Sequence, residues 1–248
     1  MESRPSSGTR VVMVTGASRG LGRAIAVGFG RAGDRVVVNY RTDAAEAERT
    51  VRAVEEAGGT AIPYQADVRD AKNVAAMVAA TVDRWGRLDI LVCNAAATED
   101  RLLIRVSDED WDKVVDTTLT GAFHCLQQAG AVMQARKAGA VILIGSLAGL
   151  QGRAGQAPYA AAKAGLVGLM RSVAREWGPS NMRINLILPG WHATALTDFR
   201  DDPAPPPFEP VLGHGTTPAA VADFVVALAA LPNVSGQVFT LDSRIAPS

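Results

Sequence analysis

Apolar residues along this chain fall into short continuous runs that alternate with longer amphipathic stretches. The short runs, which predict strands, are Val11–Thr15, Arg35–Asn39, Thr60–Gln65, Asp89–Cys93, Ala140–Gly145, Arg183–Leu188 and Gln237–Leu241. The stretches between them, which predict helices, are Gly20–Ala32, Ala44–Ala57, Ala71–Trp85, Asp108–Ala135, Pro158–Trp177 and Pro218–Ala230. The strand segments show little alternation of polar and apolar residues, as expected when helices cover both faces of a sheet.

This alternation predicts an α/β fold with a single Rossmann-like, doubly wound domain. Its seven-stranded parallel sheet would carry helices on both faces, because parallel strands are joined by crossover helices. We expect the domain to span residues 10–248 and to follow a disordered tail over residues 1–9. Residues 198–210 contain five prolines and several acids, which predicts a flexible loop.

Composition narrows the classes of partner. Lys plus Arg and Asp plus Glu both number 25, so the net charge is zero and neither nucleic acid nor an anionic membrane surface is indicated. Cys93 and Cys125 lie in apolar segments without metal-ligand spacing, which predicts buried thiols and no metal site. The polar first ten residues lack the apolar segment of a signal peptide. No apolar run approaches the ~20 residues of a membrane span. We therefore expect a cytoplasmic protein.

The first strand leads directly into a glycine-rich segment, Thr15–Gly22, and then into a helix. Gly16, Gly20 and Gly22 are spaced G-x-x-x-G-x-G. Glycines at such a junction let backbone N–H groups approach a phosphate, and the helix N-terminus adds a partial positive charge. An ordinary tight turn is the alternative, but three glycines at the first strand–helix junction favour dinucleotide binding.

A second glycine pattern has the familiar dinucleotide spacing but the wrong context. Gly28, Gly30 and Gly33 match G-x-G-x-x-G, yet they lie at the end of a predicted helix and before a strand. We interpret Gly33 as a helix stop, and we do not assign these glycines to a nucleotide site.

The end of the second strand indicates which dinucleotide is bound. Folds that bind NAD usually place an acidic residue there to bind the ribose hydroxyls. This strand ends Asn39-Tyr40-Arg41, without that acid. Arg19 and Arg41 can instead offer two guanidinium groups to a 2′-phosphate. The sequence therefore predicts NADP(H), unless both arginines merely face solvent.

Tyr159 and Lys163 lie four residues apart in a predicted helix, and therefore on one helix face. A free tyrosine has a pKa of about 10, and a neighbouring cation lowers it. Ser146, which follows an apolar run, supplies a hydroxyl that can hold a carbonyl. A surface Tyr–Lys pair is the alternative interpretation, but the nucleotide signals favour a general acid.

Taken together, these motifs resemble the short-chain dehydrogenase/reductase family over nearly the whole chain. The motifs are Thr15–Gly22, Ala66-Asp67-Val68, Asn94-Ala95-Ala96, Ser146, Tyr159 with Lys163, and Pro189-Gly190. Within the family, residues Thr98–Trp111 and Gly152–Lys163 are similar to those of the 3-oxoacyl-[acyl carrier protein] reductases.

The resemblance implies a role for each matching residue. Tyr159 would protonate a ketone oxygen, Lys163 would lower the tyrosine pKa and bind ribose hydroxyls, and Ser146 would bind the substrate carbonyl. The implied NADP(H)-binding residues are Gly16, Ser18, Arg19, Gly20, Leu21, Gly22, Asn39, Arg41, Asp67, Val68, Asn94, Ala95, Tyr159, Lys163, Pro189, Gly190 and Thr194. The hydride chemistry would belong to the cofactor.

The chain departs from the family at three places. Thr118 stands where the family has an Asn that anchors a water in the proton relay; its hydroxyl could still hold a water, so we keep it among the catalytic candidates. Ala96 replaces a Gly. Asp242-Ser243-Arg244 replaces Asp-Gly-Gly in a region of subunit contacts, so the assembly could differ from the usual tetramer.

The resemblance implies NADPH-dependent reduction of a 3-oxoacyl thioester, linked to acyl carrier protein or coenzyme A, in fatty-acid or polyketide-like biosynthesis. Two alternatives stay open: a reductase or dehydrogenase of another ketone or alcohol, and a weakly active or non-catalytic subunit of a hetero-oligomer. A homotetramer or homodimer is expected. Candidates for a substrate channel, with core packing as the alternative, are Leu102, Leu103, Ile104, Leu150 and Trp191.

Overall fold

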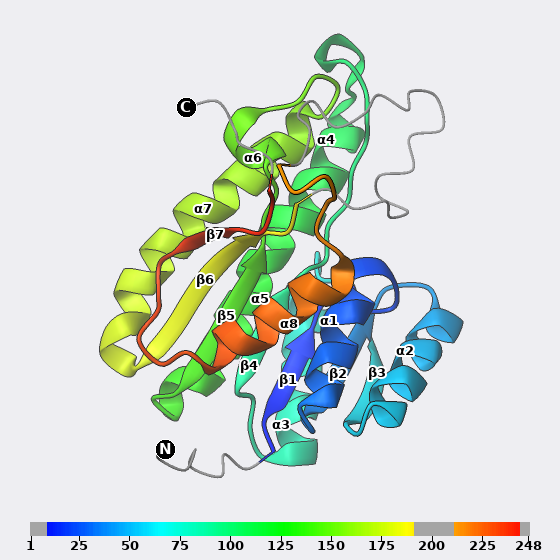
Figure 1. Ribbon diagram of the computed structural model, residues 1–248. Helices are drawn as coiled ribbons and strands as arrows, with labels where there is room; N and C mark the ends of the chain where they lie inside the picture. Colours follow the sequence, from blue (N-terminus) through cyan, green and yellow to red (C-terminus); the bar gives the residue numbers. More distant parts are fainter. Residues whose placement is uncertain (1–8, 191–210, 244–248) are drawn as a thin grey trace.

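A computed structural model describes residues 9–190 and 211–243 and shows one sheet of seven parallel strands (Figure 1). Its order is β3-β2-β1-β4-β5-β6-β7. The strands are β1 (Val11–Val14), β2 (Arg35–Tyr40), β3 (Thr60–Gln65), β4 (Ile90–Cys93), β5 (Gly139–Ile144), β6 (Met182–Leu188) and β7 (Val238–Thr240). Every neighbouring pair is parallel. The predicted doubly wound α/β fold is therefore confirmed.

Helices cover both faces of this sheet. The α-helices are α1 (Gly20–Arg31), α2 (Ala44–Glu56), α3 (Ala71–Trp85), α4 (Asp108–Val115), α5 (Gly121–Ala135), α6 (Ala148–Gln151), α7 (Ala157–Trp177) and α8 (Pro218–Ala230). Helices α1, α2 and α8 enclose one apolar cluster, and α3, α5 and α7 enclose the other on the opposite face (Figure 1). Strands β1 and β4 are buried along their whole length, which explains their lack of polar alternation.

The ends of several helices are fixed by residues that the sequence supplies locally. The Asp43 and Asp70 side chains accept backbone N–H bonds at the starts of α2 and α3. Ser107 and Asp110 form a reciprocal capping box at α4. Gly86 ends α3 in the left-handed conformation, at φ 74°. These polar groups satisfy backbone donors and acceptors that a helix end leaves unpaired.

One long helix expected from the sequence is interrupted. The segment 108–135 is α4 and α5 joined by a π-helical turn, η2 (Asp116–Thr120). The apolar spacing continues through this turn, so the sequence pattern does not mark it. Three short elements were also not predicted: α6 and the 3₁₀ turns η1 (Leu103–Arg105) and η3 (Gly178–Ser180). Each of the three is too short to show a period.

Some of the segments predicted from the sequence lie outside the residues that the structure describes. Of the predicted tail, residues 1–9, only Thr9 is described, and the predicted proline-rich loop 198–210 lies outside the described residues. Within residues 9–190 and 211–243, no helix combines the length and apolarity needed to cross a membrane.

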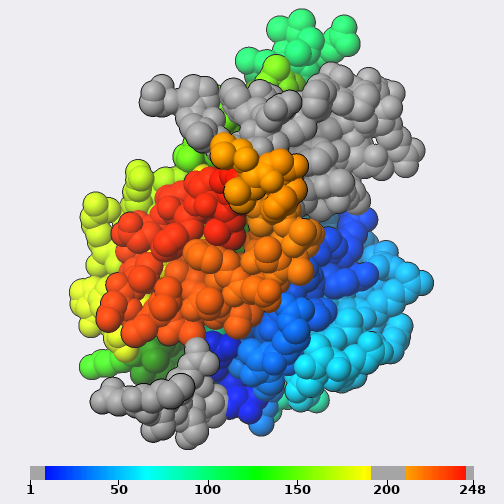
Figure 2. Space-filling model, viewed as in Figure 1, coloured from blue at the N-terminus to red at the C-terminus, as the bar shows by residue number. Residues whose placement is uncertain are grey.

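The glycines that match the misplaced dinucleotide pattern serve helix packing. A Cβ on Gly28 would lie 3.2 Å from the Ala222 side chain of α8, and one on Gly30 would lie 2.8 Å from the Val54 carbonyl oxygen of α2. Figure 2 shows α8, in orange, directly against α1, in blue. Gly33 has φ +77° just after the helix. The interpretation that these glycines are structural is thus supported by their contacts.

Replacing Gly30 by Ala should therefore destabilise the fold. The new methyl group would collide with the backbone of α2, which cannot move without shifting the helix. We expect the free energy of unfolding, measured by urea denaturation, to fall by about 1–3 kcal/mol, the usual cost of overpacking.

Gly168→Ala is the matched control, because a Cβ there meets no atom within 4 Å. Gly168 lies within α7, where Ala should raise stability by about 0.5–1 kcal/mol. Equal effects of the two substitutions would contradict the packing role of Gly30.

Candidate active site

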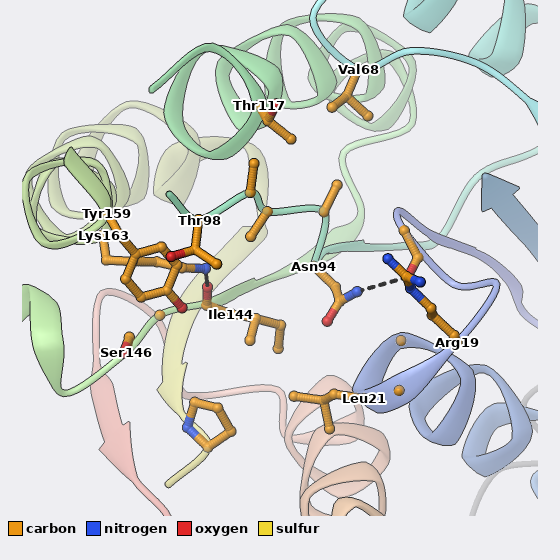
Figure 3. A pocket seen from close by; sticks show the side chains of 18 of the residues that line it. Arg19, Leu21, Val68, Asn94, Thr98, Thr117, Ile144, Ser146, Tyr159 and Lys163 are labelled. Atoms are coloured by element: carbon orange, nitrogen blue, oxygen red, sulfur yellow. Dashed lines mark hydrogen bonds between the residues drawn. The ribbon is translucent and has the colours of Figure 1, made fainter. Parts of the chain in front are cut away.

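A cavity of about 580 Å³ opens at the carboxyl ends of the strands (Figure 3). It lies where the strand order diverges between β1 and β4, which is the usual ligand site of open parallel sheets. The sequence-predicted residues that line it are Gly16, Ser18, Arg19, Gly20, Leu21, Gly22, Asn39, Arg41, Asp67, Val68, Asn94, Ala95, Ser146, Tyr159, Lys163, Pro189 and Gly190. The fold therefore brings together residues that are up to 174 positions apart.

The glycine loop between β1 and α1 has a backbone that other residues would not fit. Gly16 has φ +61° and approaches Ala95 so closely that a Cβ would lie 3.0 Å from its Cα. A Cβ on Gly22 would lie 2.4 Å from the Gly16 carbonyl oxygen. Gly20 has φ +57°, and a Cβ placed on it would have no neighbouring atom within 4 Å. The loop is thus tightly packed on its inner side and open toward the cavity.

The N-terminus of α1 is arranged to receive an anion. Arg19 is the N-cap residue but makes no side-chain capping bond, and the first turn carries no acidic residue. By contrast, α2, α3, α4 and α8 are capped by Asp43, Asp70, Ser107 and Thr217. The unpaired N–H groups of α1 and its dipole suit a phosphate group. These residues fit the diphosphate of a dinucleotide.

Two asparagines hold the glycine loop in this shape. The Asn39 side chain is buried; its Oδ1 accepts the Gly16 N–H at 3.2 Å, and its Nδ2 donates to the Ala66 carbonyl at 3.0 Å. The Asn94 Nδ2 donates to the carbonyls of Thr15 and Gly16 at 3.0 and 3.1 Å. Both amides are engaged by backbone, so these residues act first as braces of the loop.

Charged side chains surround the end of the cavity next to β2. Arg19 and Arg41 line it and are both exposed. Asp43 also lines it, but its Oδ1 accepts the Glu46 N–H at 3.0 Å. Asp67 pairs with Arg69, whose hydrogen bond lowers the pKa of the Asp67 carboxyl, while partial burial opposes this. The two guanidinium groups of Arg19 and Arg41 are left facing this end of the cavity.

The opposite end of the cavity holds Ser146, Tyr159 and Lys163 (Figure 3). Ser146 follows β5, whereas Tyr159 and Lys163 lie one turn apart on α7. The Lys163 Nζ lies 5.5 Å from the centre of the Tyr159 ring and donates a hydrogen bond of 2.5 Å to the Ile144 carbonyl. Tyr159 and Ser146 are joined by a side-chain hydrogen bond. The predicted trio is thus assembled at one point.

Burial is the largest influence on the pKa values of Lys163 and Tyr159. Desolvation lowers the pKa of Lys163 from 10.5 to about 8, an effect that the nearby Cys93 partly opposes. Desolvation also raises the pKa of Tyr159 above 10; the Ser146 hydrogen bond lowers it and the charge of Asp100 raises it further. Burial thus moves the pKa of Tyr159 in the direction opposite to the one expected from Lys163, and the role of Lys163 in lowering that pKa stays a prediction.

Thr118 occupies a different position from the rest of the predicted catalytic set. Its side chain is 1% exposed within the π turn η2, and its Oγ1 accepts the Ala97 N–H at 3.2 Å. Among the described residues that line the cavity, Thr117 is present and Thr118 is not. The hydroxyl braces the loop after β4, so a role for Thr118 in proton supply stays a prediction.

Four of the five apolar residues considered for a substrate channel lie at the surface, neither in the cavity wall nor in the core. Leu102, Leu103, Ile104 and Leu150 are 57%, 67%, 90% and 55% exposed and do not line the cavity. Figure 2 shows the segment around η1, in green at the top, projecting from the body. Trp191 and Thr194 lie outside the described residues.

Several cavity residues were not singled out from the sequence. They are Thr98, Lys113, Thr117, Ile144, Gln151, Arg153 and Gln156. Thr98 lies in the loop after β4, and Arg153 and Gln156 lie between α6 and α7; the other four belong to α4, η2, β5 and α6. For Thr98, Arg153 and Gln156, the similarity of Thr98–Trp111 and Gly152–Lys163 to family sequences was a signal; the motifs gave none for the other four.

Comparison with known proteins places this geometry in context. The family model described as short chain dehydrogenase matches residues 10–204. The 3-oxoacyl-[acyl-carrier-protein] reductase of Synechocystis sp. is 39% identical over 236 residues, covering 94% of this chain and 95% of that protein. The 3-oxoacyl-[acyl-carrier-protein] reductase FabG of Staphylococcus aureus is 41% identical over 194 residues, covering 78% and 79%.

Among solved structures, the chain is similar to a putative short-chain alcohol dehydrogenase from Sinorhizobium meliloti 1021. The TM-score is 0.87, the sequence identity is 33%, and the match covers 96% of each chain. The similarity therefore extends over nearly the whole of both chains.

Lys163→Met should make stability less dependent on pH. Below pH 8 the ammonium of Lys163 is charged in both the folded and the unfolded protein, and its desolvation opposes folding. Between pH 8 and 10.5 the folded protein loses this proton first, so the free energy of unfolding of the natural protein rises. A pKa lowered from 10.5 to about 8 corresponds to about 3 kcal/mol.

Urea denaturation from pH 7 to 10.5 measures this effect. We subtract the unfolding free energy of the natural protein from that of the Lys163→Met variant. This difference should fall by about 3 kcal/mol in all as pH rises, because only the natural protein gains stability. Lys72→Met, at an exposed position of α3, is the control and should show no such trend. A difference that does not vary with pH would contradict the buried charge.

Proposed function

Because the chain belongs to the short chain dehydrogenase family and is an oxidoreductase, we propose that it reduces a 3-oxoacyl thioester to the 3-hydroxyacyl form with NADPH. The acyl group would be linked to acyl carrier protein, as in the names of the Synechocystis and Staphylococcus relatives. The observation that carries the proposal is the meeting of Ser146, Tyr159 and Lys163 with an uncapped, glycine-flanked helix N-terminus in one cavity.

Ser146 and Tyr159 have separate roles in the reduction. The nicotinamide supplies the hydride when the cofactor is bound. The Ser146 hydroxyl orients the ketone oxygen beside the phenol, and Tyr159 transfers its proton to that oxygen as negative charge develops there. The raised pKa of Tyr159 keeps this proton in place at neutral pH. The tyrosine thus begins the reaction as an acid.

Lys163 acts on the state that follows proton transfer. Loss of the proton leaves a phenolate, and an ammonium close to the ring stabilises that charge in a buried site. The hydrogen bond to the carbonyl of Ile144, the last residue of β5, fixes the ammonium at the C-terminal end of that strand. Its two remaining N–H donors are available for the ribose hydroxyls of the cofactor. We assign Lys163 to charge stabilisation and cofactor binding.

Preference for NADP(H) follows from the charges beside β2. The 2′-phosphate would lie near Arg19 and Arg41, which are exposed at the cavity edge. Asp43, the first acid after β2 in the sequence, accepts the Glu46 N–H at the N-terminus of α2, and Asp67 pairs with Arg69. A ribose with two free hydroxyls would therefore lack the carboxylate that NAD-binding folds provide.

The Sinorhizobium structure favours a second candidate function. That protein is described as a putative short-chain alcohol dehydrogenase, so reduction of another ketone or oxidation of an alcohol is the alternative within the same chemistry. A homodimer or homotetramer, a cytoplasmic location and the weakly active subunit suggested by Thr118 stay predictions.

Tyr159→Phe tests the chemistry, because it removes only the phenolic oxygen. We expect kcat for NADPH-dependent reduction of acetoacetyl and longer 3-oxoacyl thioesters to fall by about 10²–10⁴-fold, the usual contribution of a general acid. Tyr64→Phe makes the same chemical change on β3, outside the cavity, and should keep full activity.

Two other results would redirect the assignment. Full activity of the Tyr159→Phe variant would overturn the role of the phenol. If the natural protein binds NADPH but turns over no thioester in the panel, the substrate class is wrong, and ketones and alcohols become the next substrates to assay.

Arg41→Asp tests the cofactor. The substitution removes a guanidinium from the proposed 2′-phosphate site and supplies a carboxylate for ribose hydroxyls. We expect the ratio of kcat/KM for NADPH to that for NADH to fall by at least about tenfold, equivalent to about 1.4 kcal/mol. Arg52→Asp, exposed on α2 and away from the cavity, should leave the ratio unchanged; an equal change in both variants would point to general electrostatics instead.

A further inference from the structure

Two loops that flank the catalytic trio are joined by a small hydrogen-bonded cluster around Asp100. The Gln156 Nε2 donates to both carboxylate oxygens of Asp100, at 3.0 and 3.3 Å. The Thr98 Oγ1 donates to the Asp100 Oδ1 at 2.6 Å. Next to them, the Arg101 N–H donates to the Gly155 carbonyl at 2.8 Å. The loop after β4 is thereby tied to the segment that leads into α7.

Gln156 has an unusual place in this cluster. It is the N-cap residue of α7, yet its side chain makes no capping bond to that helix. Instead, the amide is buried, at 7% exposed, and is directed to Asp100. Its backbone carbonyl accepts the Ala160 N–H at 2.8 Å, which fixes it to the first turn of the helix. Since Tyr159 lies in that same turn, Asp100 is linked to the helical turn that carries the phenol.

The cluster places a negative charge close to Tyr159. The charge of Asp100 is one of three influences on the pKa of Tyr159, after burial and the Ser146 hydrogen bond, and it raises that pKa. The other charged residues of the neighbourhood are Lys163 on α7, Lys113 on α4, which pairs with Glu99, Arg153 at the cavity edge, and Arg101, which pairs with Asp110. Asp100 is the acid among them that bears on the phenol.

We propose that Asp100 and Gln156 are positioning residues: Gln156 holds the Asp100 carboxylate beside the first turn of α7, where its negative charge acts on the proton donor Tyr159. The inference rests on the proposed reductase function and deepens it. A negative charge opposes formation of the phenolate, so it favours the acid form that reduction requires over the base form that alcohol oxidation requires. The pair would thus bias the site toward reduction.

Asp100→Asn separates the charge from the hydrogen bond. An asparagine has nearly the same shape, and its Oδ1 can still accept the Gln156 Nε2, but the negative charge is gone. The pKa of Tyr159 should then fall, since one of the groups that raise it is removed. We expect the decline of kcat/KM for reduction at alkaline pH to begin at lower pH in this variant than in the natural protein.

Gln156→Leu tests the positioning itself. Leucine fills a similar volume but cannot donate to Asp100, so the carboxylate is freed to turn toward solvent. We expect the alkaline decline to move in the same direction as in Asp100→Asn, with a loss in kcat/KM of about tenfold. A merely structural role would lower activity without moving the pH at which the decline begins.

The ionisation of Tyr159 can be read without any substrate. Tyrosinate absorbance is titrated from pH 8 to 12, and the curve of the Tyr159→Phe variant is subtracted to isolate this one phenol. The isolated transition should lie at lower pH in both Asp100→Asn and Gln156→Leu than in the natural protein. Asp112→Asn, which removes an exposed charge from α4, is the control and should leave the transition in place.

These two readouts distinguish the possible failures. A shifted tyrosinate transition in a protein that reduces no thioester would support the pair and overturn the proposed substrate. An unchanged transition in Asp100→Asn would overturn the electrostatic role, whatever the activity. A shift in Asp100→Asn without one in Gln156→Leu would overturn the claim that Gln156 holds the carboxylate.

Discussion

At the carboxyl edge of the sheet, the chain leaves β1 and β4 toward opposite faces, and the rest of the site depends on this divergence. The two strands are paired directly, through Val12–Val14 and Ile90–Val92, so the loops that follow them start side by side. The Asn94 amide bonds the Thr15 and Gly16 carbonyls, and Gly16 packs on Ala95. The space between the two loops becomes the cavity, and the N-terminus of α1 opens into it.

Desolvation is the second physical factor that shapes the site. Lys163 is buried with one hydrogen bond to a main-chain carbonyl, and Tyr159 is partly buried next to Ser146. The same burial lowers the pKa of the ammonium and raises that of the phenol. A proton is therefore held on the tyrosine, while the positive charge needed to stabilise the phenolate stands nearby. This arrangement suits an acid, the Tyr159 phenol, that keeps its proton until a substrate carbonyl is present to accept it.

Residues with polar side chains in this site serve geometry as much as chemistry. Asn39, Asn94 and Thr118 direct their side chains to backbone groups of the loops that form the cavity wall. Gln156 does the same for Asp100, and through it the loop after β4 becomes part of the surroundings of Tyr159. Binding and catalytic groups at the cavity thus depend on a layer of side chains that fix the loops behind them.

The order of strands and helices, the glycine loop and the Tyr159–Lys163 spacing were all predictable from the sequence, because each is a pattern within one element or one turn. The π turn η2, the exposure of Leu102–Ile104 and the direction of the Tyr159 pKa were not. Nor were the partners of Lys163 and Gln156. These depend on distances between elements and on the depth of burial, which packing sets in three dimensions. Spacing along the chain determined which groups could act together; only the tertiary structure decided their neighbours and their solvation.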